Sequence, residues 1–444
     1  MDERQLAALW RSQRLDLSRL RTTDGHAVEV IYRGRAHKST GPDFEGAIVV
    51  VDGQLRRGDV ELHVASSEWT AHRHDRDHRY DRVVLHVVLR DDPGYETRTA
   101  AGARIACLPL EGILSPGDTS GDAGPAGACR PRVAAMSDDY LGSRLDALGD
   151  RRLAERAAVL AAESADDGFE QCLYARLLDA LGYSQNRVPA RDLAARLSVE
   201  RLYALAHRRS PDEVCHLCRA LLLGVAGLLP SQRALPAPLD WASEEEAEEL
   251  EAIWRAFGEE WAGETLAAGD WTLAVRPLNS PQRRLAGLAE ILGRYLASGL
   301  VTRVLECLQA SDPRSAAAGL VSTFTVEAPD SYWAGYHDFG RPVPGMVAPR
   351  LVGPERAREV AASVALPLAL AWAEGIGDAD LAARTRAAFA CLPPLATNEP
   401  TRWMVEEVIG RDRRRLVASA RRQQGLYHLF RIACDQRLCE RCPL

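Results

Sequence analysis

The hydrophobic pattern of this chain changes once, from the spacing typical of strands to the spacing typical of helices. This change divides the chain into two structural regions. Residues 26–110 hold short β-branched runs divided by turn dipeptides such as Asp52-Gly53, which is typical of strands. From about residue 135 onward, apolar residues recur at helical spacing. Because 444 residues exceed one ordinary core, we predict an α+β chain with an α/β domain over 1–110 and a helical domain over 135–444. Residues 111–134, rich in Gly, Pro, Ser and Asp, form a linker or long loop.

The N-terminal part predicts a definite order of elements. Residues 1–20 form a short helix with an apolar face. A polar, histidine-rich segment at 66–80 begins with Ser66-Ser67-Glu68, which suits the start of a second helix. The four strand-like runs are 27–32, 46–53, 59–64 and 82–89. The expected order is therefore helix, three strands, helix, strand.

Composition narrows the cellular setting. No run approaches the roughly 20 uncharged apolar residues that a membrane helix needs. The N-terminal sequence MDERQLAALW lacks the apolar core of a secretory signal, so we expect a cytoplasmic protein and no membrane partner. The net charge of −7 argues against a chain that coats nucleic acid over its whole surface, but it permits a local basic groove.

Three polar residues lie where the predicted strands can bring them together. Asp43 opens the second strand, and Glu61 and His63 lie two apart in the third, so they point to the same face. A hairpin around Asp52-Gly53 brings Asp43 near Glu61. Two carboxylates on neighbouring strands make an oxygen-ligand site for Mg²⁺ or Mn²⁺, which can activate water and stabilise charge on a phosphodiester.

This order resembles the PD-(D/E)XK nuclease superfamily, in which Pro-Asp begins the second strand and acid-x-lysine occupies the third. Pro42-Asp43 matches the first motif, and Glu61-Leu62-His63 matches the second with histidine in place of lysine. The resemblance implies a restriction-endonuclease-like core in which Asp43 and Glu61 bind metal and His63 positions water. Very-short-patch repair endonucleases are a precedent for histidine in such a core. Lys38, the only lysine, or His74 would assist.

The residues also permit a structural interpretation of the same block. Asp43 can cap a turn, and Glu61 can pair with Arg57 or Arg35. His74 and His78 are four residues apart and would share a helix face. The histidine-rich segment is then either a second metal or phosphate-contact patch, or a solvated helix with Trp69 and Tyr80 in the core. The spacing of His72, His74 and His78 matches no standard zinc motif.

The C-terminus carries a second candidate metal site. Cys434, Cys439 and Cys442 have a spacing that suits Zn²⁺ or an iron–sulfur cluster, and some nucleases related by the same core carry an iron–sulfur staple. Three thiolates are one ligand short. The alternative is three cysteines that bind no metal. The candidates for a fourth ligand are Cys391, His428 and a member of the pair Cys215 and Cys218.

For two clusters in the helical part, we favour a structural interpretation over a ligand-binding one. The basic residues Arg276, Arg283 and Arg284 surround a helix start, which can contact phosphate but more simply is a capped, solvated helix end. Tyr332, Trp333, Tyr336 and His337 can stack on bases, but such a cluster is more often core.

The whole chain also resembles an uncharacterised bacterial family, a domain of unknown function. Its blocks occur here in order, and they include the C-terminal cysteines. The blocks are Leu9-Trp10, TTDG (22–25), GPDF (41–44), GDVELHV (58–64), WxxHxH (69–74), 80–88, 173–187, 221–229, 276–289 and 434–442. The resemblance implies that the N-terminal block and the cysteine tail belong to one architecture.

The leading hypothesis is Mg²⁺- or Mn²⁺-dependent cleavage of nucleic acid by Asp43, Glu61 and His63. One rival is a non-catalytic module that binds nucleic acid or protein on the same fold. Another is a metallohydrolase of small phosphoesters, which a narrow closed pocket would favour. No P-loop, GxGxxG or GxSxG motif occurs. Substrate, metal identity and oligomeric state are open from sequence.

Overall fold

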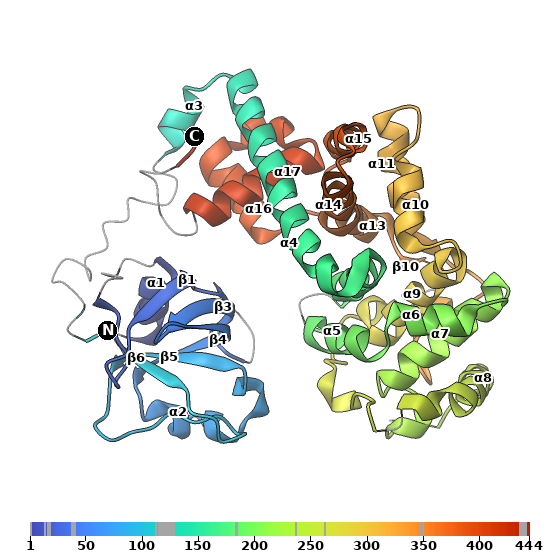
Figure 1. Cartoon of the computed structure of the whole chain (residues 1–444), viewed down its shortest axis with the longest axis horizontal. Coiled ribbons are helices and arrows are strands. Elements are labelled where there is room, and N and C mark those ends of the chain that lie inside the picture. Colours follow the sequence, from blue (N-terminus) through green and yellow to red (C-terminus); the bar gives the residue numbers. More distant parts are fainter. Residues whose placement is uncertain are drawn as a thin grey trace. The chain divides into compact units, whose positions relative to one another are not determined.

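The chain forms two compact units in the computed structural model, drawn in Figure 1. The first unit comprises residues 1–132 together with 429–444, and the second comprises 133–428. The described residues at the chain end, 429–434 and 442–444, fall in the first unit. The structure describes residues 2–12, 15, 19–36, 41–111, 113, 129–182, 185–235, 238–261, 263–345, 348, 350–434 and 442–444.

A six-stranded sheet organises the first unit. Its order is β1-β3-β4-β5-β6, with β2 paired to β3. The pairs among β1, β2, β3 and β4 are antiparallel, whereas β4 pairs with β5, and β5 with β6, in parallel. The strands are β1 Val28–Tyr32, β2 Arg35–Ala36, β3 Phe44–Val51, β4 Gln54–Ala65, β5 Val83–Arg90 and β6 Ala106–Pro109.

The turn between β3 and β4 sets the register of that hairpin. Asp52 and Gly53 both have positive φ, at 52° and 75°, which is the backbone of a two-residue hairpin turn. Val51 therefore pairs with Gln54, and the ladder continues to Phe44 opposite Val60. The parallel β4–β5 pair needs a crossover, which α2 (Glu68–Ala71) and two 3₁₀ turns provide. The predicted order of helix, three strands, helix and strand is confirmed, with the short strands β2 and β6 added.

The two faces of the sheet bury different kinds of side chain. Helix α1 (Glu3–Ser12) packs Leu6 and Trp10 against an apolar face that includes Val60 and Leu62 of β4. Because side chains alternate along a strand, Glu61 lies on the opposite face. That face carries a smaller cluster of four buried residues, Trp69, Tyr80, Val83 and Ile105. A polar residue on β4 or β5 of this face is enclosed without belonging to the main core.

The second unit is mainly helical and has its own large core. Its longest helix, α4, changes direction at Gly168, which has non-helical φ and ψ angles. Two small two-stranded sheets, β7 with β10 and β8 with β9, interrupt the predicted all-helical pattern. The helices are α4 Asp138–Leu181, α5 Arg187–Arg196, α6 Val199–Ala206, α7 Pro211–Val225, α8 Trp241–Phe257, α9 Pro281–Tyr295, α10 Leu300–Cys307, α11 Pro313–Phe324, α12 Tyr332–Gly335, α13 Pro354–Val360, α14 Leu366–Ile376, α15 Ala379–Cys391, α16 Glu399–Met404 and α17 Ala420–Leu429. The short strands are β7 Val326–Glu327, β8 Tyr336–Asp338, β9 Arg341–Pro342 and β10 Arg350–Val352.

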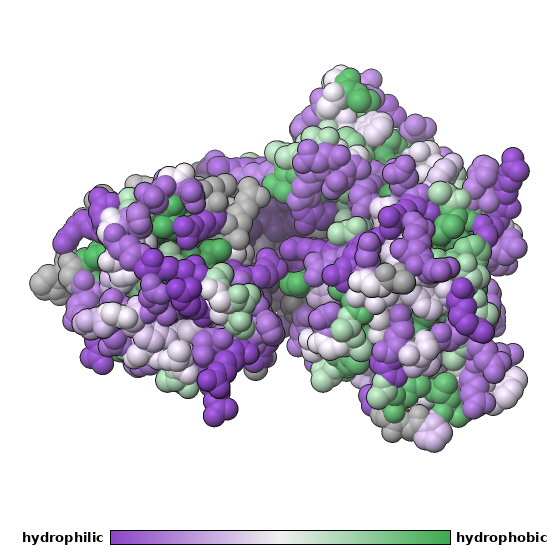
Figure 2. All heavy atoms as spheres, turned by 60° about the horizontal axis from the view of Figure 1, so that its bottom comes forward, coloured by the Kyte–Doolittle hydropathy of each residue, from purple (hydrophilic) through white to green (hydrophobic). Residues whose placement is uncertain are grey.

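Two helical stretches in this unit are long and apolar enough to cross a membrane. They are Pro211–Gln232 and Pro354–Ile376, and 83% and 67% of their most apolar windows are buried within the structure. The core helices of soluble proteins meet the same criteria, so these stretches are weak evidence for a membrane span. Figure 2 shows hydrophilic side chains over most of the visible surface, with apolar residues interspersed.

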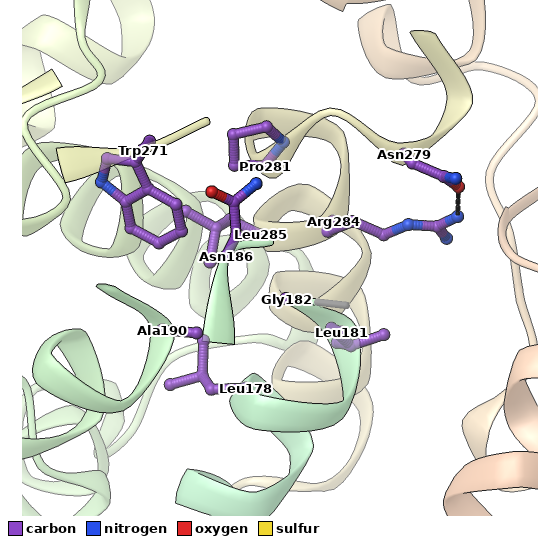
Figure 3. Close-up of a pocket in the computed structure, with 10 residues that line it drawn as sticks. All are labelled: Leu178, Leu181, Gly182, Asn186, Ala190, Trp271, Asn279, Pro281, Arg284 and Leu285. Atoms are coloured by element: carbon purple, nitrogen blue, oxygen red, sulfur yellow. Dashed lines mark hydrogen bonds between the residues drawn. The ribbon is translucent and has the colours of Figure 1, made fainter. Parts of the chain in front are cut away.

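The basic helix start at α9 is buried rather than solvated. Ser280 caps it by accepting from the Arg283 amide, which agrees with the expected cap. Arg283 is fully buried, and its guanidinium donates to main-chain carbonyls of Trp333 and Ala348. Arg284 donates to Asn279 beside a pocket lined mostly by apolar side chains, shown in Figure 3. The predicted solvation is wrong for Arg283 and Arg284, because carbonyl groups surround both guanidinium groups, whereas Arg276 is exposed.

Candidate metal centre

The β3–β4 hairpin brings Asp43 and Glu61 together. The Asp43 amide donates to Oε2 of Glu61 at 2.8 Å, and the Leu62 amide donates to Oδ2 of Asp43 at 3.1 Å. One oxygen of each carboxylate thus accepts a hydrogen bond from a main-chain amide beside the other carboxylate. The second oxygen of each remains available to another partner. Burial and the neighbouring Glu61 carboxylate raise the pKa of Asp43 to about 7. A cation placed beside the pair would relieve that repulsion.

His63 stands two residues after Glu61 and shares its face of the sheet, as predicted. Its side chain is 1% exposed, and its Nε2 lies 3.9 Å from Oε1 of Glu61. Behind it, Nδ1 of His63 lies 2.9 Å from Nε2 of His86 on β5, and Nδ1 of His86 lies 2.8 Å from Oγ1 of Thr97. Burial, followed by neighbouring histidines, lowers the pKa of His63 to about 2 and that of His86 to about 3. His63 is therefore neutral at physiological pH, unlike a lysine in its place.

Two further histidines come from the segment after α2. The helix ends at Ala71, and Arg73 adopts a left-handed backbone with φ of 63°. This turn directs the histidines on either side of it toward His63. Nδ1 of His72 lies 3.1 Å from Nε2 of His63, and Nε2 of His74 lies 3.3 Å from Oε1 of Glu61. A left-handed non-glycine residue is uncommon and is maintained only by its surroundings.

The predicted helix that would carry both His74 and His78 is wrong. His74 lies in a 3₁₀ turn at His74–Arg76, and His78 lies in a separate turn at His78–Tyr80. The side chain of His78 is 83% exposed and pairs with Asp81, whereas that of His74 is 12% exposed and stacks on Tyr80. Tyr80 and Trp69 are buried, which agrees with the interpretation that places both in the core. The left-handed residue and the short turns replace a continuous helix.

The structure brings together four of the five residues predicted for catalysis. Asp43, Glu61, His63 and His74 meet on one face, whereas Lys38 lies outside the described residues. His72 and His86 complete the group; the sequence indicated for this histidine cluster either a metal or phosphate-contact patch or a solvated helix, and it gave neither residue an individual role. His86 carries a usable signal, because Leu85 and Val87 beside it are core residues and alternation places it on the face of Glu61.

The arrangement offers nitrogen and oxygen ligands from a small volume. One ligand atom from each of His63, His72 and His74 lies within 4.8 Å of the others. The carboxylates of Glu61 and Asp43 adjoin this group. Imidazole suits transition metals, and carboxylate oxygens suit both these metals and Mg²⁺ or Mn²⁺. The chemistry available is metal-assisted activation of water.

A family comparison covers most of the chain. The model described as "Protein of unknown function (DUF2851)" matches residues 3–395. The chain belongs to the DUF2851 family. The match includes the whole N-terminal block with Asp43, Glu61 and the histidines, and it confirms the family resemblance in the sequence. No curated protein and no solved structure matches this DUF2851 chain.

The cysteine tail of this DUF2851 member lies past the matched region. Cys434 and Cys442 are half-buried, and Cys439 lies outside the described residues. Cys215 and Cys218 are buried in the core of the second unit, where burial raises the pKa of both thiols. Their burial makes them poor candidates for the fourth ligand.

The chain end is tied to a segment just before the helical unit. Arg132 donates a hydrogen bond to the main-chain carbonyl of Leu444. Half-buried Cys129 lies three residues before Arg132 in the same unit as the tail. Because more than 300 positions separate Cys129 from the cysteines of the tail, the sequence alone does not group it with them.

Proposed function

We propose that the first unit is a metal-dependent phosphodiester hydrolase of the nuclease type. One observation carries the proposal: Asp43 and Glu61 are fixed by each other's strands so that each keeps an oxygen for a ligand. A cation bound there would supply a Lewis acid for the phosphate and an activated water. A cytoplasmic location and a nucleic-acid partner remain part of the proposal.

The residues of the site divide the work by their chemistry. Asp43 and Glu61 would hold Mg²⁺ or Mn²⁺ through the carboxylate oxygens that do not accept these main-chain hydrogen bonds. His63 occupies the lysine position but is neutral, so it orients groups by hydrogen bonding and adds no positive charge. His74, at 3.3 Å from Glu61, restrains that carboxylate and is the nearest candidate to assist proton movement.

Burial favours a second candidate function, hydrolysis of small phosphoesters. The side chains of Glu61, His63 and His74 are 8%, 1% and 12% exposed. Such enclosure suits a small substrate better than a duplex, whose backbone needs an open groove. In the described ion pairs, Glu61 faces histidines and not an arginine, which supports a working site over a purely structural one.

The experiment compares the full chain with an Asp43→Ala, Glu61→Ala double variant. Both proteins are incubated with Mn²⁺ and with linear DNA, RNA or a chromogenic phosphodiester. We expect cleavage by the wild type and loss of at least about 100-fold in the variant, because a missing metal ligand removes most of the charge stabilisation. An His78→Ala variant is the matched control, because this exposed histidine lies on the same segment but pairs with Asp81. Equal activity of the wild type and the double variant would exclude the proposal, and cleavage of the small ester alone would select the second candidate.

We also propose that the cysteine tail binds Zn²⁺ or an iron–sulfur cluster, with Cys129 as the fourth ligand. The hydrogen bond from Arg132 to Leu444 supports this assignment, because it holds the two segments together. Metal content and visible absorption of the full chain test it. Cys129→Ser should release the metal, whereas Cys391→Ser, an exposed cysteine of the second unit, should not. Retention of metal by Cys129→Ser would exclude Cys129.

A further inference from the structure

We propose that Glu61, His63, His72 and His74 form a nitrogen-rich centre that binds a zinc-type transition ion in preference to Mg²⁺. Three imidazoles and one carboxylate converge here from β4 and from the turns after α2. Mg²⁺ prefers oxygen ligands and sheds its water reluctantly, whereas imidazole suits Zn²⁺, Co²⁺ and similar ions. The ligand chemistry therefore differs from the oxygen-only site implied by two carboxylates.

Three separations between the ligand atoms are close to those around a single ion. A four-coordinate Zn²⁺ with bonds of about 2.0–2.1 Å separates its ligand atoms by roughly 3.3 Å. The observed separations are 3.1 Å between His63 Nε2 and His72 Nδ1, and 3.3 Å between His74 Nε2 and Glu61 Oε1. His63 Nε2 and Glu61 Oε1 are 3.9 Å apart. These three separations lie near that value, and the ligand atoms of the three histidines lie within 4.8 Å of one another.

The groups behind His63 have the form of a metal site's outer layer. A metal-binding histidine commonly donates its other ring N–H to a fixed acceptor, which sets the tautomer and the ring orientation. Nδ1 of His63 meets Nε2 of His86, and Nδ1 of His86 meets Oγ1 of Thr97. With Nε2 of His63 on the metal, both N–H groups must point from His63 through His86 to Thr97. The threonine hydroxyl can accept that bond, so the whole chain is satisfied.

The backbone around His72 supports a ligand-binding role over simple packing. His72 is exposed, so burial of apolar surface does not hold it in place. Its neighbour Arg73 takes the left-handed backbone that turns both adjacent histidines inward. Such conformations are strained and concentrate at functional sites. Coordination of an ion by His72 and His74 would offset this strain.

The inference deepens the proposed function and rests on it for the reaction, but ion binding is measured separately from hydrolysis. The metal-free full chain is titrated with Zn²⁺ against a chromophoric chelator, and with Co²⁺ by visible absorption. Thiolate ligands in the tail give a near-ultraviolet charge-transfer band with Co²⁺ that imidazoles do not give. The two sites are thus distinguished in one titration.

Five variants define the expected result. His72→Ala and His74→Ala should each lower the Zn²⁺ affinity by at least about 100-fold and remove the imidazole-type Co²⁺ spectrum. Thr97→Val should lower it by about 10–100-fold, and Thr97→Ser, which keeps the hydroxyl, should restore it. His78→Ala should bind like the wild type. The spectrum and the Thr97→Ser rescue separate positioning from a general loss of fold.

Two results would overturn the inference. One is the absence of any imidazole-type Co²⁺ or Zn²⁺ binding in the wild type. The other is equal binding by the wild type and the His72→Ala and His74→Ala variants. Zinc binding without hydrolysis of any phosphodiester would uphold the centre and defeat the proposed function. Full Mg²⁺-dependent hydrolysis by His72→Ala and His74→Ala, with no zinc bound by the wild type, would do the reverse.

Discussion

Asp43 and Glu61 hold each other through the main chain: the Asp43 amide donates to Oε2 of Glu61 at 2.8 Å, and the amide after Glu61 donates to Asp43. This reciprocal arrangement fixes two like charges side by side at the start of β3 and in the middle of β4. Burial, and after it the Glu61 carboxylate, raises the pKa of Asp43 to about 7, whereas the hydrogen bond from the Leu62 amide lowers it. A site that gathers negative charge in this way is prepared for a cation.

Glu61→Gln should separate charge from shape at this site. The glutamine oxygen can still accept from the Asp43 amide, so we expect a change in the free energy of unfolding of less than about 1 kcal/mol. Metal-dependent phosphodiester cleavage should fall at least about 100-fold, because the charged ligand is lost. Steady-state kinetics with Mn²⁺ and urea unfolding measure the two effects.

The control for this variant is Glu68→Gln. Oε2 of Glu68 also accepts from main-chain amides of β4, at 2.9 Å from Val64 and 3.4 Å from Ala65, but Glu68 lies outside the ligand group. Its substitution should leave kcat/KM within about threefold of the wild type. If both glutamines reduce cleavage equally, the effect comes from the strand and not from a ligand at position 61.

The buried histidines predict acid sensitivity of the metal-free protein. Unfolded histidine has a pKa near 6.5, whereas the pKa of His63 is lowered to about 2 and that of His86 to about 3. As the pH falls below about 6.5, these two histidines bind protons in the unfolded chain but stay neutral in the folded chain. The free energy of unfolding therefore decreases. Asp43 has the opposite sign, because its raised pKa favours the folded state at low pH and this advantage is lost as the pH rises from about 4 to 7.

Two histidines outweigh one carboxyl group, so we expect a net loss of stability between pH 7 and pH 5. The His86→Gln variant should lose about 1–2 kcal/mol less unfolding free energy over this pH range, because one histidine that is protonated only in the unfolded chain is removed. Urea unfolding at several pH values, in the presence of a chelator, measures this difference. A parallel pH dependence of the two proteins would contradict the prediction.

Local rules predicted the hairpin part of the site and failed at the turns. The two-residue turn at Asp52-Gly53 fixes the register of β3 on β4, and the period of two fixes the shared face of Glu61 and His63. Arginine does not favour the left-handed backbone that Arg73 adopts. The convergence of His72 and His74 therefore could not be predicted from their spacing in the sequence. Helical spacing instead suggested a pairing that the chain does not form.

Tertiary partners decided the other departures from sequence. Thr97 joins the histidine chain from the segment between β5 and β6, where no strand or helix pattern indicates its position. Arg283 belongs to a basic run that is typical of a surface, yet main-chain carbonyls from distant segments satisfy its guanidinium. The pairing of Arg132 with Leu444 likewise joins segments more than 300 residues apart. Contacts at such separations leave no periodic signal.

Gly58 is predicted to be essential for the close approach of β4 and β5. A Cβ at this position would lie 2.2 Å from the Arg82 carbonyl oxygen and 2.5 Å from Cγ1 of Val84. Gly58→Ala should therefore push the strands apart and cost about 1–3 kcal/mol, the usual range for overpacking. Because Glu61 and His63 follow on the same strand, cleavage and metal affinity should fall as well.

Gly375→Ala is the control, because a Cβ there meets nothing within 4 Å. It should leave the stability unchanged or raise it slightly, since alanine favours the helix. Thermal unfolding and the Co²⁺ spectrum provide the readouts. A Gly58→Ala protein as stable as Gly375→Ala would show that β5 can shift without cost.

The second unit should depend on one buried arginine between two helices. Arg219 of α7 is 4% exposed and lies 3.2 Å from Oε1 of Glu246 on α8 and 3.0 Å from Oε1 of Glu290 on α9. Arg219→Met would leave two carboxylates without their cation, and breaking a buried ion pair typically costs about 3–5 kcal/mol. We expect a lower denaturation midpoint for the helical unit with metal binding in the first unit retained. Arg151→Met removes an exposed pair with Glu155 and should change the free energy of unfolding by less than about 1 kcal/mol. Equal midpoints for the two variants would mean that water or a rearranged side chain solvates Glu246 and Glu290 when the guanidinium is absent.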